Sequence, residues 1–174
     1  SIILLITYTN MKINWIFDLD YTLYHLHPQA TKFDYQHLQW DPHLREKIKL
    51  LPGRKLLFTN ANVWHTLKCV KMMQIDKTFH KVCCRELAGL KPDLTSYLYF
   101  NSICQVKNED KSFFFEDTID NLIQAKTFGW QTVYIGTKPE YLIYAKNNPH
   151  IINFAFPDIS QALEYFQSNI QNLI

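Results

Sequence analysis

A mostly apolar run that ends at two aspartates restricts what this chain can fold into. The run extends from Ile13 to Phe17, and Asp18, Asp20 and Thr22 follow it. A short apolar run bounded by polar residues favours a strand buried on both faces, as in a parallel sheet. Such a strand brings both aspartates to its carboxyl end, where open α/β sheets bind ligands. Neighbouring carboxylates repel each other unless a cation or a shared proton intervenes. We therefore expect a hard divalent cation such as Mg²⁺, although an Asx turn after a strand is the simpler alternative.

Segments with strand and helix patterns alternate along the rest of the chain. Further strands are predicted at 54–60, 79–84, 112–115, 131–135 and 151–154, with helices between them and a closing helix from Asp158. This alternation predicts a single α/β domain, a Rossmann-like three-layer sandwich around a parallel sheet of about five strands. We expect residues 11–22 and 41–174 to form the core. Residues 23–40 should be a short flap, and residues 1–10 a leader or an edge strand.

Composition narrows the class of protein. The chain of 174 residues suits one domain, and 47% hydrophobic residues suffice for a sizeable core. A net charge of +2 is too balanced for wrapping duplex nucleic acid. The apolar stretch 1–9 is too short to span a bilayer, so no membrane partner is expected. The four cysteines match neither a zinc pattern nor a disulfide framework, which indicates reduced core residues and a cytoplasmic protein. They are Cys69, Cys83, Cys84 and Cys104.

Polar residues follow several of the predicted strands and should converge at one edge of the sheet. They are Asp18, Asp20, Thr22, Thr59, Asn60, Lys91, Glu116 and Asp117. Together they suit phosphoryl transfer, in which a carboxylate attacks phosphorus while a cation, a hydroxyl and an ammonium offset the charge. Thr59 also precedes a helix whose free N–H groups favour an anion.

Four motifs in this order resemble those of the haloacid dehalogenase (HAD) superfamily. They are Asp18-Leu19-Asp20-Tyr21-Thr22, Thr59, Lys91-Pro92 and Glu116-Asp117, and the resemblance covers roughly 13–166. It implies an HAD-like core in which Asp18 forms an aspartyl phosphate and Asp20 acts as general acid and then base. It also implies that Thr59, Asn60 and Lys91 bind phosphate. Mg²⁺ would lie on Asp18, the backbone carbonyl of Asp20 and Asp117, with Glu116 nearby. The dehalogenases lack the second aspartate and need no metal, so Asp20 favours phosphate chemistry.

One branch of that superfamily is more similar than the others. The segment 56–61 with His65 following, and the segment 113–117 with Asn121 following, resemble the pyrimidine 5′-nucleotidases. Relatives in that branch carry a helical cap between the first two motifs, whereas here the cap is reduced to 23–40. The resemblance therefore implies an open site, of the kind that accepts larger substrates or is closed by oligomerisation.

The flap contains the candidate residues for substrate recognition. Tyr24, His25, His27 and Trp40 could contact substrate, and aromatic rings such as those of Tyr24, Tyr35 and Trp40 could stack on a base. These rings could equally cover the edge of the core. A metal site formed by His25, His27 and His37 matches no standard spacing. His65 is interpreted as structural.

The sequence therefore predicts a Mg²⁺-dependent phosphatase of phosphomonoesters. The expected partner is a small phosphorylated substrate, a nucleoside 5′-monophosphate or a similar molecule, with a homo-oligomer as a way to close the site. Two alternatives stay open. One is a phosphatase of macromolecules, such as a phosphoprotein or a nucleic-acid end. The other is a non-catalytic binding protein that has kept the fold.

Overall fold

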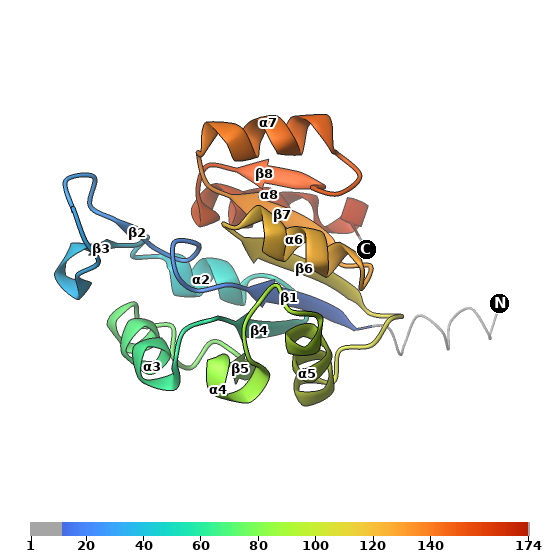
Figure 1. The fold of residues 1–174 in the computed structure, drawn as a ribbon, viewed down its shortest axis with the longest axis horizontal. Helices are drawn as coiled ribbons and strands as arrows, with labels where there is room; N and C mark the ends of the chain where they lie inside the picture. Colours follow the sequence, from blue (N-terminus) through green and yellow to red (C-terminus); the bar gives the residue numbers. More distant parts are fainter. Residues whose placement is uncertain (1–11, 174) are drawn as a thin grey trace.

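The computed structural model describes residues 12–173, so the expectation for residues 1–10 lies outside the described residues. Six strands form the central sheet: β1 (Ile13–Phe17), β4 (Arg54–Phe58), β5 (Lys81–Cys83), β6 (Lys111–Glu116), β7 (Gln131–Ile135) and β8 (Phe154–Phe156). Their spatial order is β5-β4-β1-β6-β7-β8, and every neighbouring pair is parallel (Figure 1). The α/β class is thus confirmed.

The sheet has six strands rather than about five, and its last strand begins later than predicted. The expected strand at 151–154 is instead β8, which pairs in parallel with β7. The backbone N–H groups of Ile151 and Ile152 both donate to the carbonyl of Asn148. They therefore close a turn, and the chain pairs with the sheet from Phe154 onward. The strand predicted at 79–84 is shorter, because only Lys81–Cys83 pairs with β4.

Alternate residues of the central strands enter two separate hydrophobic cores. Trp15, Phe17, Phe113 and Phe115 point to one face of the sheet, where their neighbours come from α2 (Leu44–Lys49), α3 (Val63–Met72) and α8 (Ile159–Leu173). Ile16, Phe58 and Phe114 point to the other face, covered by α4 (Arg85–Ala88), α5 (Leu94–Cys104), α6 (Ile119–Lys126) and α7 (Pro139–Asn147). This alternation follows from the period of two in a strand. It gives the expected three layers.

The segment 23–40, expected as a short flap, contains regular secondary structure. Two short strands, β2 (His25–Leu26) and β3 (Leu38–Gln39), form an antiparallel pair, and a 3₁₀ turn, η1 (Tyr35–His37), precedes β3. The N–H of His27 donates to the carbonyl of His37 at 2.8 Å, which closes the base of the hairpin. In Figure 1 the hairpin projects past the end of β1, beyond the sheet.

The strand order places a crevice beside β1. Connections lead from β1 to β4 and β5 on one side, and β6, β7 and β8 follow on the other side. In such doubly wound sheets ligands bind at the carboxyl ends of the strands where the order reverses. Here that point lies between β1 and β6, which end at Phe17 and Glu116.

Among residues 12–173, no helix is both long and apolar enough to cross a membrane.

Candidate active site

Asp18 lies at the centre of the carboxyl edge and is held from both neighbouring strands. Its N–H donates to the carbonyl of Phe115 on β6 at 3.0 Å, so the parallel pairing continues one residue past β1. Its Oδ1 accepts from Lys91 Nζ at 2.9 Å and its Oδ2 from Thr22 Oγ1 at 3.0 Å. Only 6% of Asp18 is exposed. Burial raises its pKa to about 7, with the charge of Glu116 adding to the rise and Lys91 opposing it.

Lys91 is a buried ammonium with three acceptors. Its Nζ donates to Asp18 Oδ1, to Glu116 Oε2 at 2.8 Å and to the carbonyl of Phe58 at 2.7 Å. Burial by itself lowers the pKa of Lys91, but the two carboxylates outweigh that effect and the pKa is raised. Lys91 is therefore a fixed positive charge beside Asp18.

Glu116 and Asp117 follow β6 and differ in how their oxygens are used. Glu116 Oε1 accepts from the N–H groups of Asp117 and Thr118, and Oε2 accepts from Lys91. Burial raises the pKa of Glu116 to about 7, with Lys91 opposing the rise. Burial also raises the pKa of Asp117 to about 6; its hydrogen bond with Glu116 lowers the value and the charge of Asp18 raises it. Asp117 Oδ1 is 3.5 Å from Thr22 Oγ1.

This acidic cluster fits a hard divalent cation. One carboxylate oxygen each from Asp18, Glu116 and Asp117 lie within 4.8 Å of one another. Oxygen ligands of this kind are those that Mg²⁺ prefers, and raised carboxyl pKa values are the expected result of grouping buried carboxylates without a cation. Both oxygens of Glu116 are hydrogen bonded, Oε1 by two backbone N–H groups and Oε2 by Lys91, whereas Asp117 Oδ1 has a longer contact of 3.5 Å with Thr22. Asp117 is therefore the better placed of these two to join Asp18 as a ligand. Glu116 then holds Lys91 and the turn after β6.

Thr59 and Asn60 follow β4 on the other side of Asp18, and their side chains make different hydrogen bonds. Thr59 Oγ1 accepts from the N–H of Ala61 at 3.0 Å, which leaves its hydroxyl proton available to an anion. The Asn60 side chain instead makes a reciprocal pair with the backbone of Lys91, because Oδ1 accepts from the Lys91 N–H and Nδ2 donates to the Lys91 carbonyl. The amide of Asn60 thus positions the segment that carries Lys91.

The predicted residues line a small cavity at this edge. Its volume is about 160 Å³, and it is lined by Asp18, Asp20, Tyr21, Thr59, Asn60, Glu116, Asp117, Thr118 and Asn121. Lys91 lies beneath Asp18 and is only 4% exposed. The structure therefore brings Asp18, Asp20, Thr59, Glu116 and Asp117 together around one space.

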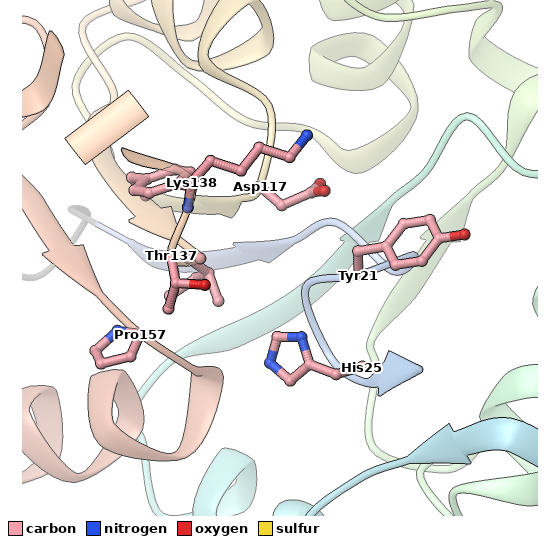
Figure 2. Close-up of a pocket in the computed structure, with 9 residues that line it drawn as sticks. Tyr21, His25, Asp117, Thr137, Lys138 and Pro157 are labelled. Carbon is pink, nitrogen blue, oxygen red and sulfur yellow. The ribbon is translucent and has the colours of Figure 1, made fainter. Parts of the chain in front are cut away.

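A larger pocket adjoins this cavity and shares Tyr21 and Asp117 with it. Its volume is about 330 Å³, and its other lining residues are His25, Tyr134, Ile135, Gly136, Thr137, Lys138 and Pro157. Figure 2 shows Tyr21 and His25 on one side and Thr137, Lys138 and Pro157 on the other. Sequence reasoning did not select Thr137 and Lys138. They follow β7, so the rule that polar residues after parallel strands share one edge could have found them.

The flap residues separate into different environments. His25 lines the larger pocket. Tyr24 is only 1% exposed, so its ring belongs to the core and presents no face to a base. Trp40 lines a different hollow, formed with Leu23, Tyr24, His25, Gln39, Asp41 and the start of α8. His27 is exposed, and its Nδ1 accepts from the N–H of Gln29 within the hairpin.

His65 contacts the site, although sequence reasoning interpreted it as structural. It lies in the first turn of α3, where Asn62 accepts from its N–H at 2.8 Å. Its Nε2 is 2.6 Å from Asp20 Oδ1. Its position in the sequence was the available signal, because the helix after Thr59 begins at the carboxyl edge of the sheet and its first turn stays there.

Comparisons with known proteins identify the fold. No protein-family model matches the sequence, and no curated protein matches it. Among solved structures, L-2-haloacid dehalogenase from Xanthobacter autotrophicus is similar with a TM-score of 0.68 at 13% identity, covering 94% of this chain and 100% of that one. A Thermotoga maritima protein provisionally assigned as a β-phosphoglucomutase gives 0.67 at 14% identity, covering 92% and 99%. A Clostridium difficile protein provisionally assigned as a phosphatase gives 0.64 at 15% identity, covering 94% and 98%. The expectation of an HAD-like Rossmann core is thereby confirmed.

Proposed function

We propose that this protein is a Mg²⁺-dependent phosphatase that hydrolyses phosphomonoesters through an aspartyl phosphate on Asp18. The observation that carries the proposal is the buried Asp18 carboxylate, held by the Lys91 ammonium at 2.9 Å, in a cavity that Asp20, Thr59 and Asp117 also line. A nucleophile, a candidate proton donor, an anion ligand and a metal ligand thus surround a space of phosphoryl size. The fold is shared with a dehalogenase, but Asp20 and the acidic cluster favour phosphate chemistry.

The proposed reaction has two steps. A carboxylate oxygen of Asp18 attacks phosphorus, the bond from phosphorus to the ester oxygen breaks, and that oxygen takes a proton from Asp20. Asp20 then accepts a proton from water, whose oxygen attacks phosphorus and releases inorganic phosphate and the free Asp18 carboxylate. Thr59 and Lys91 stabilise the negative charge that develops on the phosphoryl oxygens. When bound by Asp18 and Asp117, Mg²⁺ supplies charge neutralisation between the two anions.

The proposed substrate is a nucleoside 5′-monophosphate or a similar small phosphomonoester. The pocket of about 330 Å³ beside the cavity has the size and position for the leaving group. It offers the rings of Tyr21 and His25 for contact with a planar group and the Thr137 hydroxyl and Lys138 ammonium for polar contacts. The resemblance to pyrimidine 5′-nucleotidases supports the same choice.

A macromolecular substrate is the second candidate. It is favoured by the exposure of the hairpin tip and of Tyr21, which leave the site without a helical cover. A phosphopeptide or a phosphorylated oligonucleotide could then reach Asp18 from solvent. A homo-oligomer that closes the site would favour the small substrate instead.

Phosphate release in the presence of Mg²⁺ tests the function. The panel contains para-nitrophenyl phosphate, the common nucleoside 5′-monophosphates, a 5′-phosphorylated oligonucleotide and a phosphopeptide. We expect turnover by the natural protein and none by Asp18→Asn, which keeps the shape of the residue but not the nucleophile. The preferred panel member decides between the two substrate classes. Absence of both turnover and Mg²⁺ binding would favour a non-catalytic binding protein.

A further inference from the structure

One oxygen of the Asp20 carboxylate is already occupied by two protein groups. Tyr24 Oη donates to Asp20 Oδ1 at 2.5 Å, and His65 Nε2 lies 2.6 Å from the same oxygen. Asp20 lines the cavity beside Asp18. Because two donors converge on Oδ1, the Asp20 carboxylate cannot rotate about its Cβ–Cγ bond without losing both hydrogen bonds. Asp20 is thus held in one orientation before any substrate arrives.

The chemistry of the partners assigns the protons. An ionised carboxylate only accepts hydrogen bonds, so His65 Nε2 carries the hydrogen that faces Asp20. In a neutral imidazole the other nitrogen then accepts, and Tyr35 Oη lies 2.6 Å from His65 Nδ1. Tyr35 Oη therefore donates to His65 Nδ1, and His65 Nε2 donates to Asp20 Oδ1. When Asp20 is protonated, its proton must lie on Oδ2, since Oδ1 still accepts from Tyr24 and His65.

His65 is held by two parts of the molecule that are distant in sequence. Its backbone is fixed by the Asn62 cap of α3. Its ring packs against the flap, and the ring centroids of Phe33 and Tyr35 lie 5.2 Å and 5.4 Å from the His65 ring centroid. Lys68 Nζ lies 3.9 Å from the centroid of the Tyr35 ring, on which it packs. The Cys69 thiol is 3.5 Å from His65 Nε2, but burial raises its pKa to about 12, so it stays a neutral thiol.

We propose that His65 is a positioning residue for the general acid and base, a role that rests on the phosphatase function proposed above. Together with Tyr24 it fixes Oδ1 of Asp20, so that Oδ2 is the oxygen that exchanges the catalytic proton. In the first step the Oδ2–H bond breaks and the proton joins the ester oxygen as the bond from phosphorus to that oxygen breaks. In the second step Oδ2 takes a proton from the attacking water. Tyr35 extends this support to the flap, so the flap helps to orient Asp20.

The dependence of rate on the leaving group tests this role. Para-nitrophenyl phosphate has a leaving group that needs little protonation, whereas a nucleoside 5′-monophosphate releases an alkoxide that needs a proton donor. A positioned general acid contributes about 10²- to 10⁴-fold. We expect His65→Phe to lower kcat for the nucleotide by about 10- to 100-fold, and kcat for para-nitrophenyl phosphate by only about 2- to 5-fold, as part of that contribution. KM should change little for either substrate.

Three further variants make the result specific. His65→Gln offers an amide donor in place of Nε2 and should restore part of the nucleotide rate. Tyr35→Phe keeps the ring but not the hydroxyl, and should show a weaker form of the same selective loss. Thr66→Ala is the matched control on the same helix, because Thr66 is buried and its hydroxyl bonds the carbonyl of Asn62 at 2.8 Å. It should change both rates by the same factor.

The outcomes separate this inference from the function on which it rests. Equal losses for the two substrates in His65→Phe would overturn the positioning role while leaving the phosphatase function in place. If His65→Phe does not fold, His65→Gln and Tyr35→Phe decide by the same comparison of substrates. No turnover of para-nitrophenyl phosphate by the natural protein would overturn both, since Asp18 would then not be a nucleophile towards phosphorus.

Discussion

At the scale of single residues, the charge balance of the site depends on Lys91 and its two carboxylates. Asp18 and Glu116 are both buried and both bond Lys91 Nζ, so one cation faces two anions. Asp117 adds a third carboxylate to the group. Removing charges from water is expensive unless they are compensated. With three carboxylates and one ammonium, the ionised cluster is therefore two positive charges short of balance, which a divalent cation would supply.

Mg²⁺ should stabilise the protein, and more so at high pH. The folded-state pKa values of Asp18 and Asp117, about 7 and about 6, are raised above the value of 3.8 for a free aspartate. Without metal, these groups therefore destabilise the fold progressively as pH rises from about 4 to about 7. Mg²⁺ competes with protons for the same oxygens. We expect the rise in Tm on adding Mg²⁺ to be larger at pH 8 than at pH 5.5.

Differential scanning fluorimetry with and without EDTA measures this effect. Asp117→Asn removes one proposed ligand and should lose most of the Tm increment at pH 8. Asp120→Asn, a change of the same kind on the exposed side of α6, is the control and should keep it. An increment that is the same at both pH values would contradict metal binding by these carboxylates.

The sequence predicted which residues would meet, but not what every side chain would do. Asp18, Thr59, Lys91 and Asp117 could be predicted to converge because each follows a parallel strand or the turn after one. Asn60 was predicted to bind phosphate, but the pairing of its side chain with the Lys91 backbone could not be predicted, because it depends on how two loops distant in sequence approach each other. His65 was missed because its contact with Asp20 depends on where α3 leaves the sheet.

At the scale of elements, the turn between α2 and β4 depends on Gly53. Its φ is +100°, and a Cβ there would lie 2.5 Å from the carbonyl oxygen of Ile13 at the start of β1. The backbone of this turn thus touches the neighbouring strand directly. The close approach accompanies the register in which Arg54 pairs with Asn14.

Gly53→Ala should therefore destabilise the protein by about 2–4 kcal/mol, since it combines a disfavoured φ with a backbone clash. Gly89→Ala is the matched control, because Gly89 also has a positive φ of +78° but faces open space. It should lower the free energy of unfolding by only about 1 kcal/mol. Urea unfolding measures both values, and equal losses would show that the contact with Ile13 does not matter.

Element boundaries were predictable where a local signal exists. Pro52-Gly53 has a composition typical of a turn, and the chain turns there between α2 and β4, with a positive φ at Gly53. The start of β8 was misplaced because Ile151 and Ile152 look like strand residues, while the turn that takes up their N–H groups has only Asn148 as its signal. The β2–β3 pair was missed because strands of two residues have no detectable alternation.

At the scale of the whole molecule, the side chain of Phe166 packs α8 against the central strands β1 and β6. Its ring lies 5.6 Å from Trp15, 5.3 Å from Phe113 and 5.5 Å from Phe115, all in edge-to-face geometry. The side chain is fully buried. Helix α8 thus completes the hydrophobic core on one face of the sheet, against which β1, the strand that leads to Asp18, is packed.

Phe166→Ala should lower the free energy of unfolding by about 3–5 kcal/mol, because it leaves a cavity among aromatic rings. Phe166→Leu keeps most of the volume and should lower it by less than about 1.5 kcal/mol. Both values come from urea unfolding followed by tryptophan fluorescence, since Trp15 reports on this core. A small loss in Phe166→Ala would mean that α8 contributes little to the core.

The closed base of the β2–β3 hairpin makes its tip a natural entry point for added sequence. The tip residues from Pro28 to Lys32 are mostly exposed, while the His27 to His37 hydrogen bond holds the two arms together. The entropy of closing a loop grows slowly with its length, so even a whole inserted domain need not disturb the sheet. Tyr35 lies outside that tip and would keep its contact with His65. A new recognition module could therefore be grafted here to redirect the proposed phosphatase without rebuilding its site.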